Sequence, residues 1–159
     1  MKKPQPIRRE VMIEAPPDVV FSFLTDPAKF ILWLGRVAEL DARPGGLFRV
    51  NVNGRDVVRG TFLEVVPPRR VVFTWGWEGK ESAVPPGSTR VEVTLAPEGA
   101  GGTRLALTHS GLPEPSESGH DAGWVHYLAR LGVAAAKGDP GPDPLGTLET
   151  KHGSKSGAS

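Results

Sequence analysis

His109 has the strongest claim to chemistry among the side chains of this sequence. It follows Leu105 and Leu107 at alternate positions of a predicted strand, so its side chain should point to the same side as theirs. An imidazole among apolar groups could anchor a polar group of a ligand or act as a general acid or base. A buried neutral histidine, bonded to a backbone or tyrosine group, is the alternative that we favour.

The three other histidines offer weaker candidates. His120 and Asp121 lie in the first turn of a predicted helix, where they could meet the sheet near His109, although a pair that caps the helix is the simpler interpretation. His126 should face solvent, and His152 lies in a polar tail. The sequence contains neither a zinc-binding pattern nor any cysteine, so we predict no metal, no cofactor and no thiol chemistry.

A strand rich in tryptophan suggests a deep apolar interior. Val71, Phe73, Trp75 and Trp77 alternate along residues 69–77 and share one face of the strand. Together with aromatic and apolar residues elsewhere they would line a cavity that binds a ligand, or they would pack against one another and leave no void. The candidate ligand-binding residues are Phe48, Phe62, Phe73, Trp75, Trp77, His109, Trp124, Tyr127 and Leu128.

Composition and charge exclude several classes of protein. The chain has 159 residues and a net charge of +1, which gives no electrostatic footprint for nucleic acid. No apolar run approaches the roughly 20 residues of a membrane helix, and no apolar segment follows the first lysines as it would in a secretory signal. We therefore expect a cytoplasmic protein with a single domain over residues 1–137 and a flexible tail rich in glycine, proline and serine over residues 138–159.

The hydrophobic periodicity predicts one strand, two short helices, a run of antiparallel strands and one long helix. A strand at Ile7–Glu14 precedes an apolar helix, and Asp26 caps a second, short one. Alternating patterns then predict strands in the segments 37–42, 47–52, 56–66, 69–77, 91–95 and 105–110. Ser118 and Asp121 resemble a capping box that would open the final helix, which continues to about Ala135.

The hairpin around Asn53 and Gly54 allows its register to be predicted. A two-residue loop would place arginines among apolar residues, whereas a three-residue loop with glycine in the left-handed position keeps each face uniform. The three-residue loop puts Phe48, Val50 and Val52 on one face with Val58, Gly60 and Phe62. Arg49, Arg55 and Arg59 would then form a basic stripe on the opposite face. That stripe could contact an acidic partner, although a solvated surface is the simpler interpretation.

These elements predict an α+β fold in which a curved antiparallel sheet of about six or seven strands wraps around the long C-terminal helix. The apolar face of such a sheet needs a cover, and the last helix can supply it. A strongly curved sheet that grips one helix often leaves a space between them, where a small ligand can bind.

Several motifs, in this order, resemble the START-like or Bet v 1-type (SRPBCC) superfamily. Ile13-Glu14-Ala15-Pro16 precedes the first helix, residues 60–65 are followed by Pro67-Pro68 and by Val72-Phe73-Thr74-Trp75, and residues 103–111 precede Gly123-Trp124 and Tyr127-Leu128. The combination, over about residues 7–136, is similar to the subgroup of homologues of the activator of the ninety-kDa heat-shock protein ATPase. The resemblance implies a helix-grip fold with a cavity between the sheet and the long helix.

The resemblance implies no single function. Members of the superfamily bind lipids, sterols or other apolar molecules, and some catalyse cyclisation or dehydration. We expect non-catalytic binding of a small apolar molecule. The alternatives are a module that regulates a chaperone in the stress response or binds another protein, and a cyclase or lyase that uses His109. A homodimer through an exposed sheet edge or helix is a further option.

Overall fold

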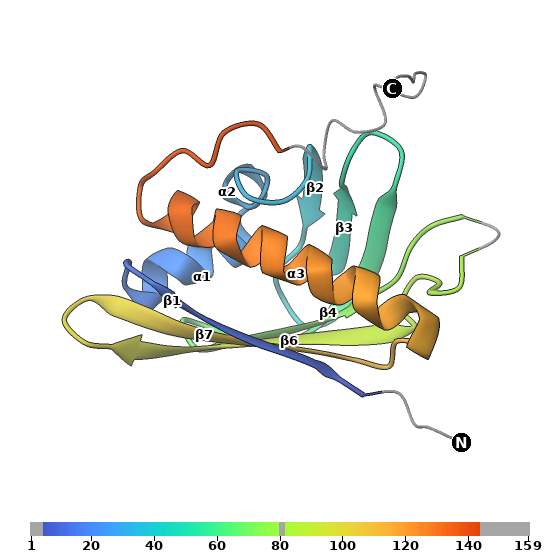
Figure 1. Ribbon diagram of the computed structural model, residues 1–159, viewed down its shortest axis with the longest axis horizontal. Coiled ribbons are helices and arrows are strands. Elements are labelled where there is room, and N and C mark those ends of the chain that lie inside the picture. Colours follow the sequence, from blue (N-terminus) through green and yellow to red (C-terminus); the bar gives the residue numbers. More distant parts are fainter. Residues whose placement is uncertain (1–4, 80–81, 144–159) are drawn as a thin grey trace.

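Antiparallel strands and one long helix form most of the computed structural model, which describes residues 5–79 and 82–143 (Figure 1). In chain order the elements are β1 (Ile7–Ile13), α1 (Pro17–Thr25), α2 (Pro27–Phe30), β2 (Val37–Leu40), β3 (Leu47–Asn51), β4 (Val57–Val66), β5 (Arg70–Trp75), β6 (Thr89–Glu98), β7 (Gly102–Ser110) and α3 (Glu114–Ala135).

The seven strands form one antiparallel sheet in the order β1-β7-β6-β5-β4-β3-β2. Figure 1 shows α3 crossing one face of this sheet, with α1 and α2 beside it. Strand β7 illustrates why the helix packs there, because Leu105, Leu107 and His109 are all buried while the intervening residues are not. The predicted helix-grip fold is therefore confirmed, and the sheet, expected to have about six or seven strands, has seven.

The β3–β4 hairpin has the predicted register. Phe48 pairs with Gly60 and Val50 with Val58, and the loop between Val52 and Asp56 has three residues. Gly54 has a φ of 93°, a backbone conformation that glycine adopts without the strain of a Cβ. The side chains of Phe48, Val50 and Val58 on the apolar face of the hairpin are fully buried.

A register shift in β4 accompanies the outward position of a carboxylate. The pairing of β4 with β5 is irregular between Phe62 and Glu64. Strict alternation would have put the Glu64 side chain on the buried face with Phe62. Instead it accepts a 2.9 Å hydrogen bond from Arg70 and is partly exposed. This ion pair with Arg70 holds the pKa of Glu64 below its usual range.

Helix α3 begins one turn earlier than the sequence predicted. It starts at Glu114, directly after Pro113, and Pro115 occupies its first turn. Proline suits these positions because the first N–H groups of a helix have no partner within the helix. The prediction of a capping box at Ser118 was therefore wrong.

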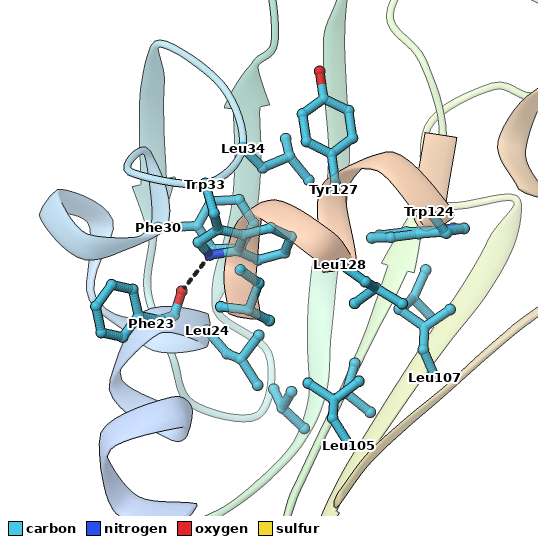
Figure 2. Packing of buried hydrophobic residues seen from close by; sticks show 14 of the residues in the cluster. Phe23, Leu24, Phe30, Trp33, Leu34, Leu105, Leu107, Trp124, Tyr127 and Leu128 are labelled. Atoms are coloured by element: carbon cyan, nitrogen blue, oxygen red, sulfur yellow. Dashed lines mark hydrogen bonds between the residues drawn. The ribbon is translucent and has the colours of Figure 1, made fainter. Parts of the chain in front are cut away.

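Phenylalanine side chains fill the interior between α2 and the sheet. Phe48 stacks on Phe73 with ring centroids 4.1 Å apart, and it meets Phe30 and Phe62 edge to face. Figure 2 shows Trp33 beside Phe30, with its indole N–H donating to the carbonyl of Phe23 at 2.9 Å. These phenylalanines are all fully or almost fully buried, so this end of the interior is closed.

The chain returns along α3 after the helix ends. Arg130 donates to the carbonyls of Pro140 and Gly141 and to that of Trp33. The first six residues of the predicted flexible tail, 138–143, thus lie against α3, and the rest of that tail lies outside the described residues. In the described ranges, no helix is long and apolar enough to cross a membrane.

Candidate functional site

A cavity of about 340 Å³ lies between the N-terminal half of α3 and the tryptophan-bearing end of the sheet. One wall is a single face of α3, and β5 with the residues after it forms the other. The lining residues are Leu34, Val52, Trp75, Trp77, Pro115, Ser116, Gly119, His120, Gly123, Trp124 and Tyr127. Among residues 5–79 and 82–143, no aspartate, glutamate, lysine or arginine lines the cavity.

The predicted ligand-binding residues divide into two groups. Trp75, Trp77, Trp124 and Tyr127 border the cavity. The other five are buried in the core and do not border it; they are Phe48, Phe62, Phe73, His109 and Leu128. The phenylalanines lie on the predicted face of the sheet but at its closed end. Figure 2 shows Leu128 beside Leu105 and Leu107, beneath the helix.

His109 is held by a continuous chain of hydrogen bonds. The indole N–H of Trp124 donates to Nδ1 of His109 at 3.0 Å, so Nε2 carries the proton and donates to the hydroxyl of Thr89 at 2.8 Å. Thr89 in turn donates to the carbonyl of Trp75 at 2.8 Å. Burial, and secondarily the nearby charge of protonated His120, lowers the pKa of His109 to about 3. The imidazole is therefore neutral and has both nitrogens engaged.

His120 repeats this arrangement at the cavity wall. Trp77 donates its indole N–H to Nε2 of His120 at 3.0 Å, and Nδ1 donates to the carbonyl of Ser116 at 2.9 Å. Burial lowers the pKa of His120 and favours its neutral form. The rings of His109 and His120 meet edge to face with centroids 5.5 Å apart. Two tryptophan–histidine pairs, Trp77–His120 and Trp124–His109, thus fix the orientation of four rings.

Trp75 is the exception among these indoles. Its ring borders the cavity and meets Trp77 nearly at a right angle, with centroids 5.6 Å apart. Its Nε1 is the one buried side-chain polar atom without a hydrogen-bond partner within residues 5–79 and 82–143. An unpaired buried donor costs roughly 1–3 kcal/mol, so the position of this ring is maintained by packing alone.

Tyr127 connects the rim of the cavity to the segment after α3. Its hydroxyl donates to Oδ2 of Asp143 at 2.7 Å, and Nε2 of His126 lies 2.8 Å from Oδ1 of the same carboxylate. Burial raises the pKa of Tyr127, and the hydrogen bond to Asp143 acts in the same direction. Figure 2 shows the hydroxyl of Tyr127 pointing away from the leucines of the core. His126 is therefore partly buried and bonded, although the sequence predicted that it would face solvent.

The predicted ligand-binding residues include only four of the eleven residues that line the cavity. The added residues are mostly small or lie outside strands: Leu34, Val52, Pro115, Ser116, Gly119, His120 and Gly123. Helical spacing contained a usable signal, because Ser116, Gly119, His120 and Gly123 are three or four positions apart and so share a face. The predicted helix began only at Ser118, which concealed the first of these positions.

The arrangement offers an apolar, aromatic surface rather than a reactive group. The imidazoles of His109 and His120 are neutral and bonded within the protein, and the described part of the chain contains no group of three or more side chains that could hold a metal ion. The cavity is suited to exclude water from an apolar molecule.

Comparison with known proteins identifies relatives. The family described as "Activator of Hsp90 ATPase homolog 1-like protein" matches residues 14–136, whereas no curated protein matches. An AHSA1-like protein from Rhizobium etli is 51% identical, with 89% of this chain and 88% of that chain covered and a TM-score of 0.70. CalU16 from Micromonospora echinospora is 32% identical, with 89% and 78% covered and a TM-score of 0.69.

A more distant structure shares the fold alone. PFC0360w, an Hsp90 activator from Plasmodium falciparum, is 24% identical, with 81% of this chain and 94% of that chain covered and a TM-score of 0.65. The family match spans most of the chain and includes strands β2 to β7 and the whole of α3. The chain belongs to the family of Activator of Hsp90 ATPase homolog 1-like proteins.

Proposed function

We propose that this protein binds a small hydrophobic molecule, without catalysis, in the cavity between α3 and the sheet. The observation that carries the proposal is the lining itself, in which three tryptophans and a tyrosine surround about 340 Å³. No carboxylate, ammonium or guanidinium group of the described residues takes part in it. Pockets for small molecules typically measure roughly 300–1,000 Å³ and are mostly apolar.

The hydrogen bonds argue against the alternative of a cyclase or lyase that uses His109. Its two nitrogens are bonded to Trp124 and Thr89, and its ring does not border the cavity. A general acid or base must come within hydrogen-bond reach of the proton that it transfers. His120 does border the cavity, but both of its nitrogens are also engaged.

Ligand binding can be tested with a matched pair of serines on α3. Ser116 borders the cavity, whereas Ser118 lies on the same helix outside it and is exposed. The experiment measures thermal stabilisation and native mass spectra of the protein with a panel of a fatty acid, a sterol, a terpenoid and several aromatic compounds. We expect at least one compound to bind, Ser116→Phe to weaken it about tenfold or more, and Ser118→Phe to leave it unchanged. No binding by any compound would refute the proposal, as would equal affinities of the two variants.

Regulation of a chaperone is a second candidate, favoured by the family to which the chain belongs. The contact would use the outer face of β3 and β4, where Arg49 and Arg59 lie near Glu78 at 2.9 and 3.9 Å. Its test is the ATPase rate of an Hsp90-type chaperone with and without the protein, with Arg49→Glu as the variant. A rate unaffected by the wild-type protein would remove this candidate.

Homodimerisation and a cytoplasmic location stay predictions. Strands β1 and β2 are the two edges of the sheet, and an edge strand offers unpaired backbone groups to a second chain. Sedimentation of the purified protein over a range of concentrations would measure its mass in solution.

A further inference from the structure

Two glycines of α3 form part of the cavity wall, although the packing around them leaves space for a side chain. Gly119 and Gly123 are four residues apart and both border the cavity. A Cβ built on either of them would meet nothing within 4 Å. By contrast, a Cβ on Gly60 or Gly76 would lie within 2 Å of a backbone oxygen, so the sheet requires glycine there. Glycine is the poorest helix former after proline, and α3 therefore gives up helical stability at both cavity positions.

The absence of these two side chains leaves the backbone of α3 bare on the side that faces the cavity. The rings of Trp75 and Trp77 lie on the sheet side, and Trp124 lies next to Gly123 on the helix. Trp75 and Trp124 are in contact, with centroids 5.1 Å apart. A bare helix surface and flat indole rings give walls without protruding groups, which favours a flat guest that contacts ring faces.

Of the three indole N–H groups on this wall, only that of Trp75 has no hydrogen-bond partner within the described residues, and none of the three carries a charge. The indole N–H groups of Trp77 and Trp124 are donated to His120 and His109, and both imidazoles are neutral because burial lowers their pKa values. In the part of the chain that the structure describes, no carboxylate, ammonium or guanidinium group borders the cavity to pair with an ion. Moving an ion from water into such a site without a partner would be costly.

We propose, resting on the binding function proposed above, that the ligand is an uncharged, planar aromatic ring system. We further propose that Gly119, at the exposed rim, and Gly123 keep the helix side of the cavity open to receive it. The volume of about 340 Å³ is within the range of small-molecule pockets, and the flat indole faces favour a ring system over an acyl chain. The two glycines are specificity-determining positions, since any side chain there would occupy space that the ring system needs.

The experiment uses a neutral fluorophore and its charged counterpart. N-Phenyl-1-naphthylamine is uncharged, and 8-anilinonaphthalene-1-sulfonate has the same rings with a sulfonate added. Dodecanol serves as an uncharged molecule without rings. Titrations followed by dye fluorescence, with dodecanol as competitor, measure the three affinities for the wild-type protein. We expect the neutral dye to bind at least about tenfold more tightly than either of the others.

Alanine variants at three glycines of α3 test the role of the cavity positions, and one of the three is the control. Gly132 is also in α3 with open space at its Cβ, but it lies outside the cavity. Because alanine favours the helix, all three single variants and the double variant G119A/G123A should keep or raise the thermal midpoint. We expect G119A/G123A to weaken binding of the neutral dye about tenfold or more, and Gly132→Ala to change it less than about twofold.

The outcomes separate the two proposals. If no compound of the earlier panel and neither dye binds, the binding function itself fails. If apolar compounds bind but the sulfonate or dodecanol binds as tightly as the neutral dye, the assignment of the ligand class is overturned. If a correctly folded G119A/G123A binds the neutral dye like the wild type, the role of the two glycines is overturned.

Discussion

The aromatic residues near α2 and those near the start of α3 meet in different ways. At the closed end, Phe30, Phe48, Phe62 and Phe73 contact one another directly, and Phe48 stacks on Phe73 at 4.1 Å. At the cavity end the rings are tryptophan and histidine, and two N–H···N hydrogen bonds of 3.0 Å set their orientations. A phenylalanine side chain has no polar atom, so packing alone decides its orientation, whereas a buried indole N–H usually points toward a hydrogen-bond acceptor. We attribute the open cavity at this end to the hydrogen bonds, which fix the orientations of Trp77 and Trp124 and prevent these rings from filling the space.

The largest expected effect is at the closed end. Phe48 is fully buried, and its replacement by alanine removes a ring that contacts several neighbours. We expect Phe48→Ala to lower the free energy of unfolding by about 3–5 kcal/mol, as measured by urea denaturation. Leu63→Ala is the control, because the side chain of Leu63 is exposed. A loss below about 1 kcal/mol for Phe48→Ala would mean that this end is not tightly packed.

The same substitution at two tryptophans would isolate the hydrogen bond at the cavity end. Trp124→Phe removes the donor to Nδ1 of His109 and leaves a buried acceptor unpaired. Trp75→Phe removes a donor that has no hydrogen-bond partner among the described residues. Both changes delete similar volume. We expect Trp124→Phe to be the more destabilising by about 1–3 kcal/mol in urea denaturation. Equal losses would show that the pair with His109 contributes nothing.

Acidification should lower the stability of the fold through His109, beside the cavity. The folded-state pKa of His109 is lowered to about 3 from about 6.5 in the unfolded chain, so the folded protein binds fewer protons between these values. Its contribution to stability is complete above about pH 6.5 and is lost as the pH falls toward 3. Between about pH 7.5 and 5.5, His109 alone should account for a loss of about 1.4 kcal/mol.

Nuclear magnetic resonance separates this effect from that of the carboxylates. The ring-proton resonances of His109 should not titrate above about pH 4.5. A titration midpoint near the ordinary histidine value would contradict the buried, neutral imidazole. The carboxylates whose pKa values are lowered by arginine partners, such as Glu64 and Glu78, contribute only at lower pH.

The smallest expected effect is at an exposed ion pair near the cavity end. Arg9 of β1 donates two hydrogen bonds, of 2.7 and 2.6 Å, to the carboxylate of Asp121 on α3. Both side chains are exposed, and exposed pairs contribute little because water and salt screen them. Arg9→Ala should leave the thermal midpoint nearly unchanged at physiological salt. A large decrease would mean that this pair, and not the rings, holds α3 over the cavity.

Most of the fold could be predicted because it depends on patterns local to each element. The alternation of Val50 and Val52 with polar neighbours, and the Asn53-Gly54 turn, were sufficient to predict the hairpin register. The start of α3 was missed because Pro113 and Pro115 favour a first turn without forming a side-chain cap.

The site was harder to predict because its partners are distant in the sequence. Periodicity placed His109 correctly on the inner face, but nothing local indicated that Trp124 and Thr89 would occupy both of its nitrogens. The phenylalanines share a face with Trp75, yet position along the sheet, and not the face, decides which residues border the cavity. Glycines were assigned no role because residues without side chains carry no signal in a hydrophobic pattern.

The bond between Tyr127 and Asp143 makes the rim of the cavity accessible to a spectroscopic label. Pro142 lies beside Asp143, whose carboxylate is anchored to two successive residues of α3. Because the sequence contains no cysteine, Pro142→Cys would create a unique attachment point for a dye or a spin label. A bound ligand that shifts the ring of Tyr127 would also move the carboxylate of Asp143. A label at position 142 would then report whether the cavity is occupied.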